Sequence, residues 1–304
     1  MGLQLRTRVA KPARRLALST VLVASMLVLG GCSFQDFREF RWAMPEPLTE
    51  QAPHILELWR WAWVAAMLVG ILVWGLIFYA SARFRRRHPD EVPVQTRYNL
   101  PLEIFYTIAP IMMVVVLFYW TVTVQNEVLH EEDEPDRTIE VVGQQWSWTF
   151  NHGVGQPDHS RDEDEPVYDQ YAYTAGNASD IPTLMLPEGE TVHFNLYSPD
   201  VIHSFWVPGF LMKMDVVPGR VNHFQVTPNK QGTYAGKCAE LCGTYHSRMI
   251  FNVEVVSSEE YDAYLDDLEQ QGNIADEPLL GGADAYTTEG LDENDDEETD
   301  GGQP

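Results

Sequence analysis

Twelve residues near the end of the chain gather an unusual set of side chains. The stretch CAELCGTYHSRM, residues 238 to 249, holds Cys238 and Cys242, followed by His246 and Met249. Thiolate, imidazole and thioether are soft ligands, and together they favour copper over magnesium, calcium or manganese. Zinc accepts cysteine and histidine but gains little from a thioether. The stretch therefore predicts a copper site.

A site of this kind needs a further ligand, and His203 in HSFW supplies one from a different inter-strand loop. The main alternative is a disulfide between the two cysteines, since oxidation is normal outside the cytoplasm. A disulfide would need neither the histidines nor the methionine. We expect His193 and His223 on the exposed face of strands, and the remaining histidines near helix ends or in loops: His54, His88, His130, His152 and His159.

The charge of the chain is large and unevenly spread. Its 304 residues carry a formal charge of -25, and 13 of the 20 Lys and Arg lie at or before Arg97, with none after Arg248. The strongly acidic C-terminal half argues against nucleic acid and for basic partners or a saline exterior. With 45% hydrophobic residues, the chain can bury one large domain or two smaller ones.

The N-terminus resembles an export signal of the lipoprotein type. Basic residues precede the apolar run 16–30, which ends in LGGC at Cys32. We interpret residues 1–31 as a signal peptide and Cys32 as a lipidated N-terminal cysteine. The alternative is an uncleaved first helix with a chance cysteine. Residues 32–54 would then form an extracytoplasmic N-terminal segment.

Two further apolar runs, 61–82 and 104–124, are long enough to cross a bilayer. We expect helices at about 58–83 and 104–126, forming a transmembrane hairpin within residues 55–130. The loop between them, RFRRRHPDEVPVQTR, is basic and is assigned to the cytoplasm by the positive-inside rule. Everything after about residue 125 is therefore expected outside the membrane.

The following region alternates short β-rich runs with turn residues, which predicts an antiparallel β-sandwich at residues 131–257. The acidic segment 152–180 is interpreted as an insert that leaves the sandwich. Residues 258–304 are expected to form an acidic tail, with one short helix in SSEEYDAYLDDLEQQ and the remainder disordered.

Five motifs, taken together, resemble subunit II of the haem–copper cytochrome c oxidases. They are LEIFYTIAP, GQQWSWTF, SPDVIHSFWVP, MDVVPGRVNHF and CAELCGTYHSRM, and the resemblance covers roughly residues 50 to 256. It implies a two-helix transmembrane hairpin joined to an all-β cupredoxin-like Greek-key sandwich. It also implies an oxidoreductase and translocase that takes electrons from cytochrome c, reduces oxygen to water in subunit I and translocates protons.

The resemblance implies a dinuclear copper A centre. Cys238 and Cys242 would bridge both ions, His203 and Met249 would complete one, and His246 with the backbone carbonyl of Glu240 would complete the other. The Glu240 carboxylate would also reach a magnesium ion at the junction with subunit I, since magnesium prefers oxygen ligands.

Further residues match functional positions of the family. Trp146 resembles the aromatic that receives the electron from cytochrome c, while Trp148, on the same strand face, is expected in the core. Asp200 resembles an acidic docking residue. Glu103 resembles the glutamate at the entrance of a proton channel, although an acid at a helix start also suits the helix dipole.

The lipobox and the enlarged acidic domain resemble the actinobacterial form of this subunit, with subunits I and III as partners. There the donor is a dihaem cytochrome c of a bc complex, and the insert would act as a docking bracket. A nitric oxide reductase using the same copper centre is the principal alternative. A copper-free quinol oxidase subunit, a nitrous oxide reductase and a thiol-redox protein fit the motifs less well.

Overall fold

The computed structural model describes residues 19–21, 39–88, 90–155, 168–177 and 180–281. It divides into two units, Met1–Met44 and Pro45–Pro304, and all the elements discussed below belong to the second. Cys32, most of the expected signal peptide, the centre of the acidic insert and the end of the expected tail lie outside the described residues.

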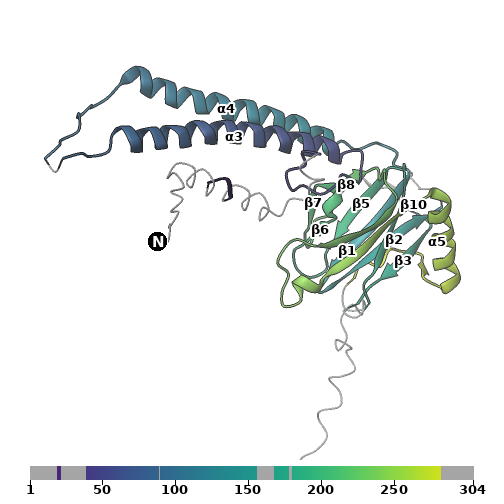
Figure 1. Ribbon diagram of the computed structural model, residues 1–304. Coiled ribbons are helices and arrows are strands. Elements are labelled where there is room, and N and C mark those ends of the chain that lie inside the picture. The colour runs from purple at the N-terminus through teal and green to yellow at the C-terminus, as the bar shows by residue number, and fades with distance from the viewer. Residues whose placement is uncertain (1–18, 22–38, 89, 156–167, 178–179, 282–304) are drawn as a thin grey trace, which may run out of the picture. The chain divides into compact units, whose positions relative to one another are not determined.

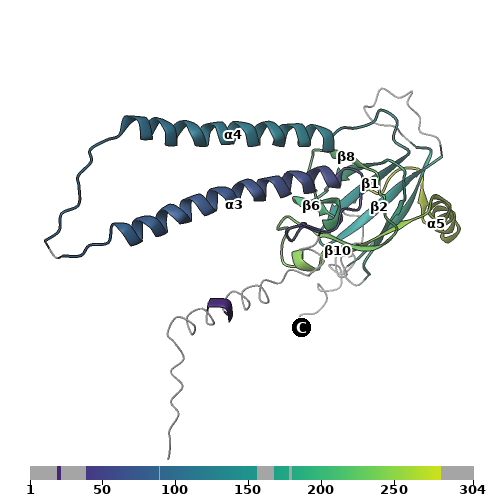
Figure 2. The same ribbon diagram turned by 45° about the horizontal axis from the view of Figure 1, so that its top comes forward.

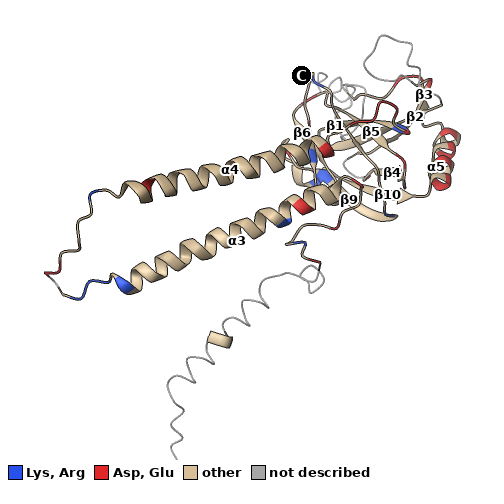
Figure 3. Cartoon of the chain, turned by 90° about the horizontal axis from the view of Figure 1, so that it is seen from above, with Lys and Arg blue, Asp and Glu red and all other residues tan. Residues whose placement is uncertain are grey.

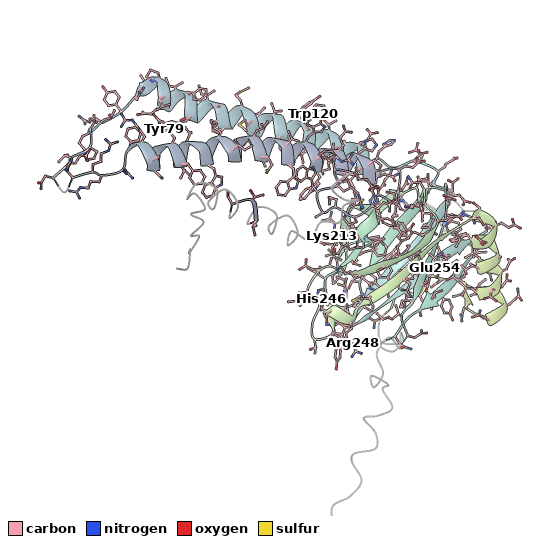
Figure 4. All side chains as sticks on the ribbon, in the orientation of Figure 1. Tyr79, Trp120, Lys213, His246, Arg248 and Glu254 are labelled. Atoms are coloured by element: carbon pink, nitrogen blue, oxygen red, sulfur yellow. The ribbon has the colours of Figure 1, made fainter. Side chains whose placement is uncertain are left out.

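Two long helices, α3 (Ala52–Arg83) and α4 (Leu100–Val128), run side by side in Figures 1 and 2. Each is long and apolar enough to cross a membrane. Their large apolar side chains are exposed over most of their length, including Tyr79 and Trp120 in Figure 4. Charged residues concentrate toward the helix ends in Figure 3. This pattern suits lipid or another membrane helix rather than water.

Both helices begin earlier than the apolar runs suggest. A proline lies in the first turn of each, where a missing N–H costs nothing. The Asn99 side chain caps α4 by accepting from Leu102 N, and Glu103 accepts from Asn99 N at 2.9 Å. The first-turn proline in both helices, and the Asn99 cap in α4, thus mark helix starts that lie before the apolar stretches.

The rest of the unit is a sandwich of two sheets. The six-stranded sheet has the order β11-β3-β2-β1-β5-β8, and the five-stranded sheet has the order β4-β10-β9-β6-β7. The strands are β1 Arg137–Gln144, β2 Ser147–Val154, β3 Gln170–Ala175, β4 Thr183–Pro187, β5 Val192–Tyr197, β6 His203–Trp206, β7 Lys213–Val216, β8 Asn222–Val226, β9 Gly232–Cys238, β10 Ile250–Val256 and β11 Ile274–Ala275.

The expectation of a purely antiparallel sandwich is wrong at two places. β1 pairs with β5 and β4 pairs with β10, and both pairs are parallel. Parallel neighbours need a long crossover, and here the intervening strands supply it. Alternation of apolar and polar residues is the same in either direction, so it does not reveal which strands run parallel.

Aromatic side chains fill the space between the sheets. Trp148 is fully buried and packs edge-on against Phe205 and Phe251, with ring centroids 5.8 and 5.3 Å away. Phe194 stacks on Phe224 at 5.1 Å. Trp148 is therefore a core residue, as expected. Its neighbour Phe205 lies on β6, two residues after His203, so this core supports the strand that begins with a predicted copper ligand.

The sandwich continues beyond the boundary expected at residue 257. Helix α5, Ser258–Gln271, starts with a capping box between Ser257 and Glu260 and buries Tyr261, Leu265 and Leu268. Its acidic residues are exposed, and Figure 3 marks them along the helix. Leu279 N then donates to Asn151 Oδ1 at 2.9 Å. The segment 258–281 is thus a packed part of the domain.

Both expected boundaries of the acidic insert, residues 152 and 180, are also wrong. Residues 152–154 complete β2, and Gln170–Ala175 form β3 between β2 and β11. Tyr171 and Ala172 are buried in this strand. The run QYAYTA, which forms β3, is flanked by acidic and turn-forming residues, and for this reason the sequence did not predict a strand there. Only residues between β2 and β3 can form the insert.

Two histidines expected at the surface or in a loop are buried. His193, on β5, is 8% exposed, and its two ring nitrogens lie 2.8 Å from Asn195 Oδ1 and 3.2 Å from Gln225 Nε2, so the buried ring keeps polar partners. His152, on β2, is fully buried, and its Nδ1 lies 2.8 Å from the Tyr261 hydroxyl of α5. His223 is half-exposed, as expected.

His152 should make the fold acid-sensitive. Burial, helped by the nearby charge of Arg137, lowers its pKa from 6.5 to about 3. Between these values the unfolded chain binds a proton that the folded chain does not, so stability falls as pH falls, by about 1.4 kcal/mol per pH unit. His152→Phe should reduce this acid loss, measured by denaturant unfolding of the detergent-solubilised chain at several pH values. The half-exposed His223→Phe is the control. Equal acid dependence in wild type and His152→Phe would contradict the assignment.

Candidate metal centre

Two cysteines lie close together without being joined. Cys238 ends β9 and Cys242 follows in the next loop, and both are buried and free. Their sulfur atoms are 3.9 Å apart, far beyond a disulfide bond length. The structure therefore presents two separate thiols, as a bridging metal site requires, and not the disulfide alternative.

Every side chain predicted as a ligand converges on these thiols. His203 Nδ1 is 3.9 Å from Cys238 Sγ, and Met249 Sδ is 3.7 Å from Cys242 Sγ. His246 Nδ1 is 3.6 Å from Cys242 Sγ. Within the described part of the chain, the only cluster of three His, Cys or carboxylate groups with metal-ligand spacing consists of His203, Cys238 and Cys242.

The predicted backbone ligand is also in place. The Glu240 carbonyl accepts from the Cys238 thiol at 3.2 Å. The Glu240 side chain itself is exposed. The loop thus turns its carbonyl toward the thiols while leaving the carboxylate available outside.

Strand pairing fixes these groups. Phe205 of β6 pairs with Cys238 of β9, which places His203 beside the cysteine loop. Cys238 N donates to Met249 O at 2.9 Å, and the Trp148 indole donates to the same carbonyl at 3.4 Å. The η2 turn, His246–Arg248, then carries the second histidine, and Figure 4 shows His246 and Arg248 on this part of the sandwich. These hydrogen bonds connect the site to the core of the sandwich.

Trp146 lies in the turn between β1 and β2, not on the strand face of Trp148. Its half-buried indole donates to Cys242 O at 3.3 Å and packs edge-on against Tyr245, with centroids 5.0 Å apart. Gly243 has φ +127°, and a Cβ there would lie 3.1 Å from the Trp146 ring. A glycine therefore allows the indole to approach the cysteine loop closely.

Asp200 does not project freely into solvent. Its Oδ1 lies 2.8 Å from His203 Nε2, and its Oδ2 accepts from Gln145 N at 2.7 Å. Gln145 in turn donates its side-chain amide to Cys242 O. Sequence reasoning missed Gln145, although its place between Gln144 and Trp146 in GQQWSW was a usable signal.

The two thiols differ in acidity. Burial opposes ionisation of Cys238, but hydrogen bonds with His203 and the backbone lower its pKa to about 7. Burial and the neighbouring Cys238 charge raise the pKa of Cys242. Two adjacent thiolates repel each other in a buried site, so a cation is the natural means of holding both in the ionised form.

The carboxylate and imidazole stabilise each other. Burial opposes ionisation of Asp200, but hydrogen bonds from His203 and two backbone amides lower the Asp200 pKa overall. Burial favours neutral His203, but the hydrogen bond to Asp200 raises the His203 pKa overall. The charge of Asp200 is therefore engaged within the site.

Three apolar side chains in or next to the segments that carry the predicted ligands are exposed. Leu241, between Glu240 and Cys242, is 78% exposed, and Tyr245 and Ile202 are 46% exposed. Sequence reasoning did not single out these three residues. Exposed apolar side chains beside a buried site suit a surface that binds another protein.

Glu103 lies in the first turn of α4, away from the thiol site, and caps the helix through Asn99. The helix-start explanation for this acid is thus observed directly.

A family model described as cytochrome c oxidase subunit II, periplasmic domain, matches residues 137–256. The chain is 47% identical to a probable cytochrome c oxidase subunit 2 of Streptomyces coelicolor, covering 86% of this chain and 89% of the relative. It is 36% identical to cytochrome c oxidase subunit 2 of Mycobacterium bovis, covering 84% and 82%. The solved periplasmic domain of subunit II from Bradyrhizobium japonicum is 24% identical, with a TM-score of 0.36, over 45% of this chain and 96% of that one.

High identity across nearly the full length of the Streptomyces relative, together with the matched domain and the converging sulfur and imidazole groups, establishes that this chain belongs to the cytochrome c oxidase subunit II family.

Proposed function

We propose that this chain is the electron-accepting subunit of a respiratory cytochrome c oxidase. It receives electrons from a cytochrome c and passes them to the haem of subunit I, where oxygen is reduced to water with proton translocation. The carrying observation is the convergence of two free buried thiols, two imidazoles and a thioether at one point. The nitric oxide reductase alternative is disfavoured, because relatives that are 47% and 36% identical to this chain are named as cytochrome c oxidase subunits.

The donor set fits a dinuclear copper A centre. Cys238 and Cys242 would contact both ions, His203 and Met249 would complete one, and His246 with Glu240 O the other. When bound, such a pair shares one unpaired electron over both ions, so accepting or releasing an electron would change the geometry of the site little. The protein excludes water from the site: Met249 is fully buried, and both cysteines are at most 5% exposed.

Copper loading of the full-length chain should produce an electron paramagnetic resonance spectrum with hyperfine splitting from two equivalent coppers. Cys238→Ser and Cys242→Ser should abolish it, because an alcohol oxygen is a poor bridging ligand for copper. Met249→Leu should retain the paired spectrum with a shifted reduction potential. A four-line signal from a single copper in the wild type would rule out this centre.

Two carboxylates extend the proposal into subunit I. The exposed Glu240 side chain would share a magnesium ion with that subunit, consistent with a carbonyl turned inward and a carboxylate left outside. Glu103, in the first turn of α4, would lie at the entrance of a proton channel. The magnesium content of Glu240→Gln oxidase and the proton uptake of Glu103→Gln oxidase test these roles, and wild-type values in both would exclude them.

We further place the chain in the bacterial cell membrane, with α3 and α4 spanning it and the copper domain outside. Cys32 would carry lipid after removal of residues 1–31. Mass spectrometry of the purified chain should find an N-terminal peptide that begins at Cys32 and carries acyl mass. A peptide with an intact Met1 or Gly2 terminus would contradict processing at this cysteine.

The donor is proposed to be a membrane-bound dihaem cytochrome c of a bc complex, received at Trp146. Tyr245, which packs against this indole, and Leu241 of the cysteine loop are both exposed and suit a protein contact, and the acidic domain suits a basic partner. Subunits I and III complete the oxidase. A tethered donor needs little electrostatic steering, because effective concentration replaces diffusion.

Residues 156–167 are proposed to be the bracket that holds this donor complex. Their replacement by a short Gly-Ser linker spares β2 and β3 and should leave the copper spectrum intact. It should weaken co-purification of the bc complex and slow quinol-driven oxygen uptake, while the wild-type rate shows only modest salt dependence. Deletion of the acidic residues 282–304 is the control for lost charge. Unchanged association and uptake in the linker variant would remove the bracket role.

A further inference from the structure

The Asp200 carboxylate accepts hydrogen bonds from several directions. Oδ1 lies 2.8 Å from His203 Nε2, 2.6 Å from Val201 N and 3.2 Å from Ser198 Oγ. Oδ2 accepts from Gln145 N at 2.7 Å. The side chain is 24% exposed. A carboxylate committed to its own chain in this way offers little of its charge to a docking partner.

Its contact with His203 determines how that imidazole faces the thiols. His203 is fully buried, with Nδ1 on the side of Cys238 Sγ and Nε2 on the side of Asp200. A carboxylate can only accept, so the ring proton belongs on Nε2 and the Nδ1 lone pair points to the sulfur site. Carboxylates that hold the second nitrogen of a metal-binding histidine fix its tautomer and ring orientation.

The other oxygen of Asp200 reaches a different part of the site. It binds the amide of Gln145, whose side chain donates to the carbonyl of Cys242. The adjacent Trp146 indole donates to that same carbonyl. One carboxylate therefore connects the loop carrying a histidine ligand, the turn carrying Trp146 and, through that turn, the loop carrying the second cysteine.

We propose that Asp200 is a positioning residue that fixes His203 toward the metal and ties the Trp146 turn to the cysteine loop. This inference rests on the proposed copper function and replaces the docking role that the sequence suggested for Asp200. Its action goes through His203 and Gln145, without contact with the metal or the donor.

The test is Asp200→Asn in the full-length chain. Asparagine has nearly the same size but only one acceptor oxygen, so its NH₂ must face one of the donors, His203 Nε2 or Gln145 N. Copper affinity should fall on the order of 10- to 100-fold, as found for other groups that support a metal ligand. The hyperfine pattern and the reduction potential should also change.

Asp215→Asn is the matched control. Asp215 lies on β7, the strand paired with β6, and its carboxylate accepts from Lys213 at 3.1 Å. The charge lost is the same, but no copper ligand loses a partner, so copper affinity and spectrum should match those of the wild type. Equal effects of the two substitutions would overturn the inference.

Asp200→Glu changes only the position of the carboxylate. It is also the test variant to use if Asp200→Asn does not assemble. It keeps the charge and both oxygens but moves them by one methylene. A positioning role predicts a changed spectrum and potential, whereas a docking role predicts an unchanged copper centre with altered salt dependence of donor oxidation. The latter result would overturn the inference. Failure of the wild-type chain to bind a copper pair would instead overturn the proposed function.

Discussion

Two thiols held 3.9 Å apart in a buried site, unlinked, are the constraint on which the rest of the domain depends. Extracytoplasmic cysteines at this spacing in sequence could close into a disulfide if the loop were free to move. Here Cys238 is fixed by strand β9 and by the hydrogen bond that its backbone N–H donates to Met249 O. Cys242 is fixed by the hydrogen bonds that its carbonyl accepts from the side chains of Gln145 and Trp146. Residues outside the 239–242 segment thus fix the positions of both cysteines.

The core of the sandwich contributes directly to that geometry. Trp148 packs against Phe205 and Phe251 and also donates to Met249 O, so one buried residue supports both the fold and a predicted ligand. Sites placed on packed strands are held more exactly than sites on isolated loops. A centre that gains and loses electrons benefits, because rigid ligands limit reorganisation. Substitution of Trp148 would therefore disturb the site as well as the stability.

Sequence reasoning could identify the two apolar helices, the β class and the side chains that converge on the two thiols, because apolar runs and the motifs of the copper loop are local signals. It could not find the parallel pairs β1–β5 and β4–β10, since strand direction leaves no trace in alternation. It also missed β3 and the packing of α5, where acidic surroundings concealed buried residues such as Tyr171 and Tyr261. The expectation for His193 was wrong for a related reason, since its burial depends on Gln225, a partner on another strand. The contact between Asp200 and Gln145 likewise joins segments that are far apart in the sequence.

In the proposed centre, Cys238 and Cys242 together hold a pair of metal ions rather than one ion or a disulfide. Native mass spectrometry of the copper-loaded full-length chain tests this most directly, because it counts metal ions and protons on the same molecule. The paired centre predicts a chain with two coppers taken up together and both thiol protons displaced. A chain with a single copper, or a metal-free chain two hydrogens lighter than the reduced form, would contradict it.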